Sequence, residues 1–325
     1  MRGLRAAVLA LTGLGALGLA ACRGGVPPPC CPGAAQRSGT GAAPIQVAVS
    51  VPPQAYFVER IGGSRVRVEV MIPPGYSHVD YPLTPRRMVA LSHAALYVKV
   101  GHPGFEFETR QIDPFLAQTP GIRVIDMSRG MRFLETGHSE GHVEGDGADG
   151  HDHGGSDPHV WVTPATVAVA AVNIERGLEA ADPAHAGEYR ANLRRFLDDI
   201  RSLDRDIRGR LEAPSGSGTA GPEGRAFMVY HPTWGYFAQE YGLKQIAIES
   251  EGREPSALRL IQLIEEARRD GVKVVFVQEG FPRKSAQVIA EAVGGRVVTA
   301  DPQQFDWLAN LRHVAAELEA TRHHA

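Results

Sequence analysis

The chain has few cysteines, and all of them lie near its beginning. It contains 3 cysteines in 325 residues, at positions 22, 30 and 31. Residues 45–325 therefore contain no thiol group. This absence excludes disulfide bonds and cysteine-bound metal from that part of the chain, and any metal there must be held by histidine or by oxygen ligands.

The chain also lacks an excess of charge of one sign. It has 37 acidic and 34 basic residues, for a formal net charge of −3, and no basic stripe is evident. A nucleic-acid partner is therefore not expected. After the first 20 residues, no apolar stretch approaches the ~20 residues that span a bilayer. The sequence predicts a water-soluble body.

The HExxH motif of zinc peptidases is missing as well. The nearest segment, HSEGH at 138–142, has a different spacing and lies among glycines, where no helix would align two histidines. A lipid-anchored zinc hydrolase is thus a competing class that the sequence disfavours, and we expect no enzyme.

The first residues have the features of an export signal. Two arginines within residues 1–5 precede a mostly apolar stretch at 6–19, which ends in Leu-Ala-Ala-Cys22. Small residues before a cysteine resemble the lipobox of bacterial lipoproteins, in which the cysteine is acylated. The alternative, a retained signal anchor, is weaker because the stretch is short and interrupted by glycines. We predict that residues 1–22 are a lipoprotein signal peptide with its lipidated cysteine.

Residues 23–44 are rich in Gly, Pro, Ala and Ser and show no periodicity. Such a composition predicts a flexible tether. Cys30 and Cys31 fall within it, and we interpret them as incidental thiols. The predicted location is extracytoplasmic, with Cys22 anchoring the body to the lipid bilayer, either on the periplasmic side or on the outer face of the cytoplasmic membrane.

The body alternates between apolar strand-like runs and amphipathic helix-like segments, once before and once after a long helical stretch. The expected strands are 45–50, 66–72, 95–100 and 122–127 in the first half, and 225–230, 244–250, 272–278 and 296–300 in the second. The expected helices between them are 53–63, 84–92 and 107–119, then 232–242, 255–271, 283–295 and 306–322. This alternation predicts an α/β fold of two βα lobes with parallel sheets, at 45–183 and 214–325.

Between the halves, apolar residues recur at three- and four-residue spacing from about 184 to 213, and Arg and Asp fill the other positions. The pattern predicts one long amphipathic helix that joins the lobes as a stiff spine. The Gly- and Ser-rich segment 214–224 then predicts a flexible connection into the second lobe.

Four side chains stand where a loop follows a strand or opens a helix. They are His78 in GYSHVDY, His159 in SDPHVWVTP, His231 in VYHPTWGYF and Asp301 in VVTADPQQF. Three neutral imidazoles and one carboxylate make a closed set of ligands for a cation such as Zn²⁺. Each histidine alone has a plainer interpretation, as a loop-capping or hydrogen-bonding residue. The prediction of a metal site therefore depends on the set.

A second group of histidines lies in the loop at 138–154. His138, His142, His151 and His153 alternate with carboxylates and glycines, and Val143 is the one large apolar residue among them. The plainer interpretation is a solvated acidic loop. The density of imidazole instead predicts weak metal binding, since 4 of the 13 histidines fall within this stretch.

The motifs together resemble those of the substrate-binding lipoproteins of bacterial zinc and manganese ABC transporters, the cluster A solute-binding proteins. The similar stretches are PGYSHVDYPLTPRRM, ALSHAALYVKVG, GIRVIDMSRGM, DPHVWVTP, VYHPTWGYFAQEYGL, IESEGREPSALRL, VVFVQEGFPRKSAQVIAEAVGGRVVTADP and DWLANLRHVAAEL. They cover nearly all of residues 45–320 in the family's order. The resemblance implies two lobes joined by a long helix, one metal ion in the cleft between them, and an ABC permease as partner. We expect a monomer.

The resemblance also implies which residues bind the metal. His159 and His231 match ligand positions, and Asp301 matches the aspartate after the family's last strand. The first motif departs from the pattern, because an ungapped match places Val79 at the ligand position and His78 at the preceding proline. His102, in VGHPGFE, is the reserve candidate.

Three imidazoles favour Zn²⁺ as the bound ion. In the family that this chain resembles, manganese-selective members tend to have Glu where His231 stands. The predicted function is capture of Zn²⁺ for high-affinity uptake through an ABC permease. Alternatives are a receptor for Mn²⁺ or Fe²⁺, and a metal-binding adhesin or metal-buffering surface lipoprotein.

Overall fold

The computed structural model describes residues 43–79, 81–135, 155–211, 225–249 and 253–322. All of them belong to one compact unit, Ala43–Ala325. The predictions for the signal peptide, for Cys22, for most of the tether and for the four loop histidines lie outside the described residues. No helix in the described part of the chain is long and apolar enough to cross a membrane.

The first lobe contains a sheet of four parallel strands in the order β2-β1-β3-β4. Its strands are β1 (Ile45–Val49), β2 (Val66–Val70), β3 (Leu96–Lys99) and β4 (Arg123–Asp126). Its helices are α1 (Pro52–Gly62), α2 (Pro85–Ser92) and α3 (Asp113–Ala117), with a 3₁₀ turn at Gly63–Arg65. The expected helix at 107–119 is interrupted, because Phe107–Ile112 forms a π-helix before α3. Pro114, which has no N–H to donate, follows this irregular turn.

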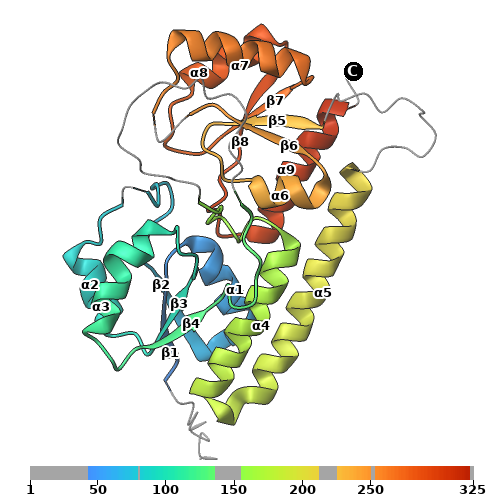
Figure 1. The fold of residues 1–325 in the computed structure, drawn as a ribbon. Helices are drawn as coiled ribbons and strands as arrows, with labels where there is room; N and C mark the ends of the chain where they lie inside the picture. Colours follow the sequence, from blue (N-terminus) through green and yellow to red (C-terminus); the bar gives the residue numbers. More distant parts are fainter. Residues whose placement is uncertain (1–42, 80, 136–154, 212–224, 250–252, 323–325) are drawn as a thin grey trace, which may run out of the picture. The chain divides into compact units, whose positions relative to one another are not determined.

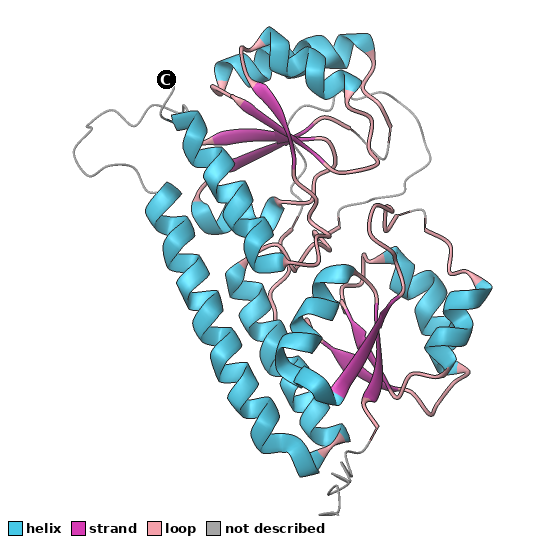
Figure 2. Cartoon of the chain, turned by 180° about the vertical axis from the view of Figure 1, so that it is seen from behind, coloured by secondary structure: helices cyan, strands magenta, loops and turns pink. Residues whose placement is uncertain are grey.

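The second lobe repeats this pattern, with the strand order β6-β5-β7-β8 and parallel pairing throughout. Its strands are β5 (Ala226–Val229), β6 (Lys244–Ala247), β7 (Val274–Val277) and β8 (Arg296–Thr299). Its helices are α6 (Gly235–Tyr241), α7 (Ala257–Arg269), α8 (Lys284–Ala292) and α9 (Trp307–Arg322). Helices cover both faces of each sheet (Figure 2). The predicted α/β class is confirmed.

A pair of helices connects the lobes (Figure 1). Helix α4 (Pro164–Ala181) leaves the first lobe, and α5 (Ala186–Leu211) returns beside it over 26 residues. The long helix expected at 184–213 begins two residues later, because Pro183–His185 forms a 3₁₀ turn. Helix α4 had not been given bounds from the sequence pattern. Helix α5 packs against α1 and α4 on one lobe and against α9 on the other.

One apolar core runs from the first lobe, along the buried side of α5, to the inner face of the second sheet. A separate, smaller core lies between the second sheet and helices α7 and α8. Two indole groups add polar contacts to the larger core. The Nε1 of Trp161 donates to the carbonyl of Pro302 at 2.9 Å, and the Nε1 of Trp307 donates to the carbonyl of Trp161 at 2.6 Å. The segment carrying His159 is thereby fixed to α9.

Candidate metal centre

His78 lies in the loop between β2 and α2. The chain turns at Gly75, whose φ of +80° is a conformation that favours glycine. The imidazole of His78 then stacks on the buried ring of Phe105, with centroids 5.3 Å apart and planes 12° apart. His78 is 7% exposed, whereas Val79 is 48% exposed. The structure therefore buries the histidine that sits one position before the family's pattern.

His159 lies just before α4, in the short segment that opens that helix. One carboxylate oxygen of Asp157 accepts hydrogen bonds from both the backbone N–H and the Nδ1 of His159, at 2.8 and 2.7 Å. The side chain of Asp157 is 5% exposed. Because Nδ1 faces this carboxylate, the other ring nitrogen, Nε2, carries the free lone pair.

His231 comes from the second lobe, immediately after β5. Its Nδ1 is paired with a carboxylate oxygen of Glu249, which follows the neighbouring strand β6. The side chain of Glu249 is 4% exposed. The Nε2 of His231 is buried and has no hydrogen-bond partner among the described residues. A buried ring nitrogen of this kind requires an explanation, and a role as a metal ligand is one.

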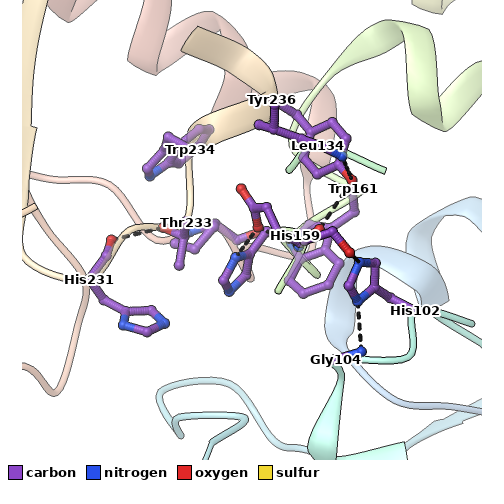
Figure 3. A network of polar contacts seen from close by, with 12 residues as sticks. His102, Gly104, Leu134, His159, Trp161, His231, Thr233, Trp234 and Tyr236 are labelled. Atoms are coloured by element: carbon purple, nitrogen blue, oxygen red, sulfur yellow. Dashed lines mark hydrogen bonds and ion pairs between the residues drawn. The ribbon is translucent and has the colours of Figure 1, made fainter. Parts of the chain in front are cut away.

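The three histidines converge on one point. One ring nitrogen from each of His78, His159 and His231 lies within 4.8 Å of the other two. The Nε2 atoms of His78 and His159 are 3.2 Å apart. Zn–N bonds of 2.0–2.1 Å at tetrahedral angles place two ligand nitrogens about 3.3 Å apart. The spacing therefore fits a shared zinc ion, and Figure 3 shows the rings of His159 and His231 pointing into the same space.

The surroundings of His78 and His159 favour the uncharged form of both rings. Burial lowers the pKa of His78 well below its usual value, and the neighbouring His159 and His231 lower it further. Burial also lowers the pKa of His159, although Asp157 opposes that effect. Only a neutral imidazole has a lone pair for a metal ion, so the site is prepared for binding at neutral pH.

His102, the reserve candidate, lies outside this group. Its Nδ1 accepts a hydrogen bond from the backbone N–H of Gly104, and its Nε2 lies 2.9 Å from the hydroxyl of Ser156 (Figure 3). Both ring nitrogens are therefore engaged in holding loops. This is the plainer role that the sequence allowed for any single histidine.

Asp301 also lies outside the group of three. One of its carboxylate oxygens accepts a hydrogen bond from the backbone N–H of Gln303 at 2.9 Å. Asp301 lines a different cavity, of about 220 Å³, together with the exposed Asp306 and His313. Burial raises the pKa of this carboxyl group. As the side chains stand, no carboxylate of the described residues completes the set of histidines.

Neither Asp157 nor Glu249 was predicted from the sequence as a functional residue. Both lie within segments that were singled out for other reasons, SDPHVWVTP and IESEGREPSA. The signal for Asp157 was its position two residues before His159. No local signal links Glu249 to His231, because the two residues meet through the pairing of β5 with β6, where the Glu249 N–H donates to the Tyr230 carbonyl at 3.1 Å.

Beside the three imidazoles lies a cavity of about 490 Å³. All three histidines line it, and the remaining wall comes from both lobes, with Leu134 and Pro158 on one side and Pro232 and Gly235 on the other. The metal position is therefore reached through a chamber within the fold.

Known proteins share this architecture. The family model "ZnuA: Zinc-uptake complex component A periplasmic" matches residues 47–321. The high-affinity zinc uptake system protein ZnuA of Yersinia pestis is 27% identical over 271 residues, which cover 79% of this chain and 82% of that protein.

Two solved structures extend the comparison to the fold. A crystal structure of ZnuA has 34% sequence identity and a TM-score of 0.74, and covers 86% of this chain and 99% of that chain. A zinc-bound deletion mutant of ZnuA has 35% identity and a TM-score of 0.73, with coverage of 86% and 98%. Because the family model spans most of its length, the chain belongs to the zinc-uptake complex component A family.

Proposed function

We propose that this protein captures Zn²⁺ outside the cytoplasm and delivers it to an ABC permease for high-affinity uptake. The observation that carries the proposal is the convergence of three buried ring nitrogens, from two lobes, within 4.8 Å of one another. We assign the metal to His78, His159 and His231. Membership in the zinc-uptake family supports zinc as the cargo.

Zinc is the cargo that the ligands favour. Three imidazoles form a nitrogen-rich site, whereas Mn²⁺ prefers oxygen ligands. The carboxylates of Asp157 and Glu249 face the Nδ1 atoms of His159 and His231, so in this arrangement they raise the basicity of the ligands without themselves coordinating. Mn²⁺ and Fe²⁺ are the alternative cargoes.

The receptor acts as a monomer held at the membrane by a lipid. The motif Leu19-Ala20-Ala21-Cys22 supplies the acylated residue, and 23–44 is the tether between the lipid and the folded body. Mass spectrometry of the mature protein from membranes tests this part. A diacylated or triacylated N-terminal cysteine supports it, and an unmodified cysteine contradicts it.

The zinc site is tested with purified residues 43–325, which contain every described strand and helix. We expect one tightly bound zinc per chain. His159→Ala and His231→Ala should each abolish tight binding, measured by competition with a chelator, and His93→Ala at an exposed position is the matched control. Unchanged zinc affinity in both site variants would contradict the assignment of these histidines as ligands.

Transport is tested in cells. Deletion of the gene should abolish growth under zinc limitation and uptake of radioactive zinc, and a His159→Ala copy should fail to restore either. An adhesin or a metal-buffering lipoprotein would bind zinc in vitro but leave uptake intact after deletion. If the deletion instead abolishes uptake of manganese and leaves uptake of zinc intact, the manganese alternative is favoured.

A further inference from the structure

The cavity beside the three histidines is much larger than a zinc ion needs. It measures about 490 Å³, whereas one water molecule occupies about 30 Å³ of liquid. Binding sites for small organic ligands commonly have volumes of about 300–1,000 Å³. The chamber is therefore of a size suited to a small molecule bound next to the metal.

The protein leaves a coordination position for such a molecule. Zinc in closed protein sites takes about four ligands, and the described residues bring three nitrogens together. Asp157 and Glu249 are occupied with the outer ring nitrogens of His159 and His231. Asp301 lines another cavity. Within the described part of the chain, the chamber is the side from which a fourth donor can reach the metal.

The charge around the metal favours a nitrogen donor over an acidic one. The buried carboxylates of Asp157 and Glu249 already balance the two positive charges of Zn²⁺. Glu135 lines the same chamber, as does Glu106, whose carboxylate is paired with Arg110 at 2.9 Å. A polyanionic ligand such as citrate would be repelled there, because like charges in a partly enclosed site raise the free energy of binding.

The chamber walls fit an amino-acid-sized molecule. Leu134, Pro158 and Pro232 contribute apolar surface. Gln245 also lines the chamber, and its side-chain oxygen accepts the backbone N–H of Trp234 at 2.7 Å. That contact leaves the Gln245 NH₂ group, with two donors, without a hydrogen-bond partner in the described part of the chain. It can donate to the carboxylate of a bound amino acid.

We propose that the protein takes up zinc as a complex with one small nitrogen-donating chelator of the amino-acid class, which lies in this chamber and supplies the remaining ligand. The inference rests on the proposed zinc function and names the chemical form of the cargo. The geometry that carries it is the set of three inward nitrogens, the missing fourth donor and the chamber with mainly apolar walls.

The test uses L-histidine as probe and residues 43–325 as protein, with free Zn²⁺ held constant by a metal buffer. If zinc and histidine bind together, histidine must raise zinc affinity by the same factor by which zinc raises histidine affinity. We expect an increase of at least about fivefold in zinc affinity, which lies at the lower end of typical coupling between ligands. Native mass spectrometry should show one zinc and one histidine per chain, and citrate should give neither effect.

Two substitutions test whether the chamber is the site. Leu134→Trp and Glu135→Trp place a large ring in the chamber and should abolish the effect of histidine. Leu258→Trp is the matched control, because Leu258 is 67% exposed on α7 and does not line the chamber. Zinc binding without histidine, measured for each variant, checks that the three imidazoles remain in place.

The outcomes separate the two proposals. No zinc binding with or without histidine refutes the proposed function itself. Tight zinc binding that histidine leaves unchanged refutes only the chelate. An equal effect of citrate, or an effect that survives both tryptophan variants, also refutes it. Finally, a variant lacking residues 138–154 should respond to histidine as the parent does. If histidine raises zinc affinity only after this deletion, then residues 138–154 supply the fourth ligand in the parent protein, and the proposed chelate is refuted.

Discussion

Glu249 offers the cleanest perturbation of the site, because it touches one histidine ring and nothing else of the metal group. Its carboxylate pairs with the Nδ1 of His231, and its side chain is 4% exposed. Asp157 is a less clean target, since the same oxygen also accepts the backbone N–H of His159. Replacing Asp157 would displace the loop as well as the ring.

The expected loss of zinc affinity follows from the buried hydrogen bond that the substitution removes. A hydrogen bond to a charged group contributes about 1.5–3 kcal/mol, and each 1.4 kcal/mol is a factor of ten in affinity. Glu249→Ala should therefore weaken zinc binding by about 10- to 100-fold, the range typical of residues that orient metal ligands. Glu249→Gln keeps an accepting oxygen but loses the charge, so we expect an intermediate loss.

The assay is chelator competition on the metal-free protein, with Glu265→Gln as a control at an exposed position of α7. The unfolding free energy of each metal-free variant is measured in parallel, to separate ring orientation from loss of fold. Zinc affinity in Glu249→Ala equal to that of the parent would refute the reasoning, because His231 would then orient itself without its carboxylate.

Three further predictions follow from other parts of the structure. Asp301→Asn should leave zinc affinity unchanged, because Asp301 lines a separate cavity and its carboxylate accepts the N–H of Gln303; a clear loss in chelator competition would mean that Asp301 moves into the site with the metal. Deletion of residues 138–154 should remove weak additional zinc equivalents seen by calorimetry and leave one tight site. Burial raises the pKa of Glu108 to about 7 from 4.5. Since the folded state prefers the protonated form, the parent should lose stability as pH rises through this window. Glu108→Gln does not ionise, so the difference in unfolding free energy should move in favour of the variant as pH rises; a constant difference in urea titrations would contradict this.

The sequence contained most of the information on the fold. Alternating apolar runs correctly predicted the two parallel sheets, because buried parallel strands are apolar on both faces. The period of Phe196, Ile200, Leu203 and Ile207 predicted α5, and these residues form its buried side. The π-helical turn at Phe107–Ile112 was not predicted, although its two apolar residues, Phe107 and Ile112, stand five positions apart rather than three or four.

The site was predictable in part, for a physical reason. Residues at the carboxyl ends of parallel strands meet at one edge of a sheet, so histidines that follow strands were sound candidates. Which way each side chain turns depends on partners remote in the sequence. His102 turns to Gly104 and Ser156, and Asp301 turns to Gln303, and neither contact could be inferred from local pattern. The ligand roles themselves remain predictions for the variants above.

The hydrogen bond between Trp307 and Trp161 has a consequence for the stage of folding at which the metal site can form. Trp307 begins α9, the last helix, and its indole holds the segment that positions His159. A chain still being synthesised, or still being threaded through a translocation pore, lacks this support. The segment that positions His159 therefore has this support only once α9 is in place.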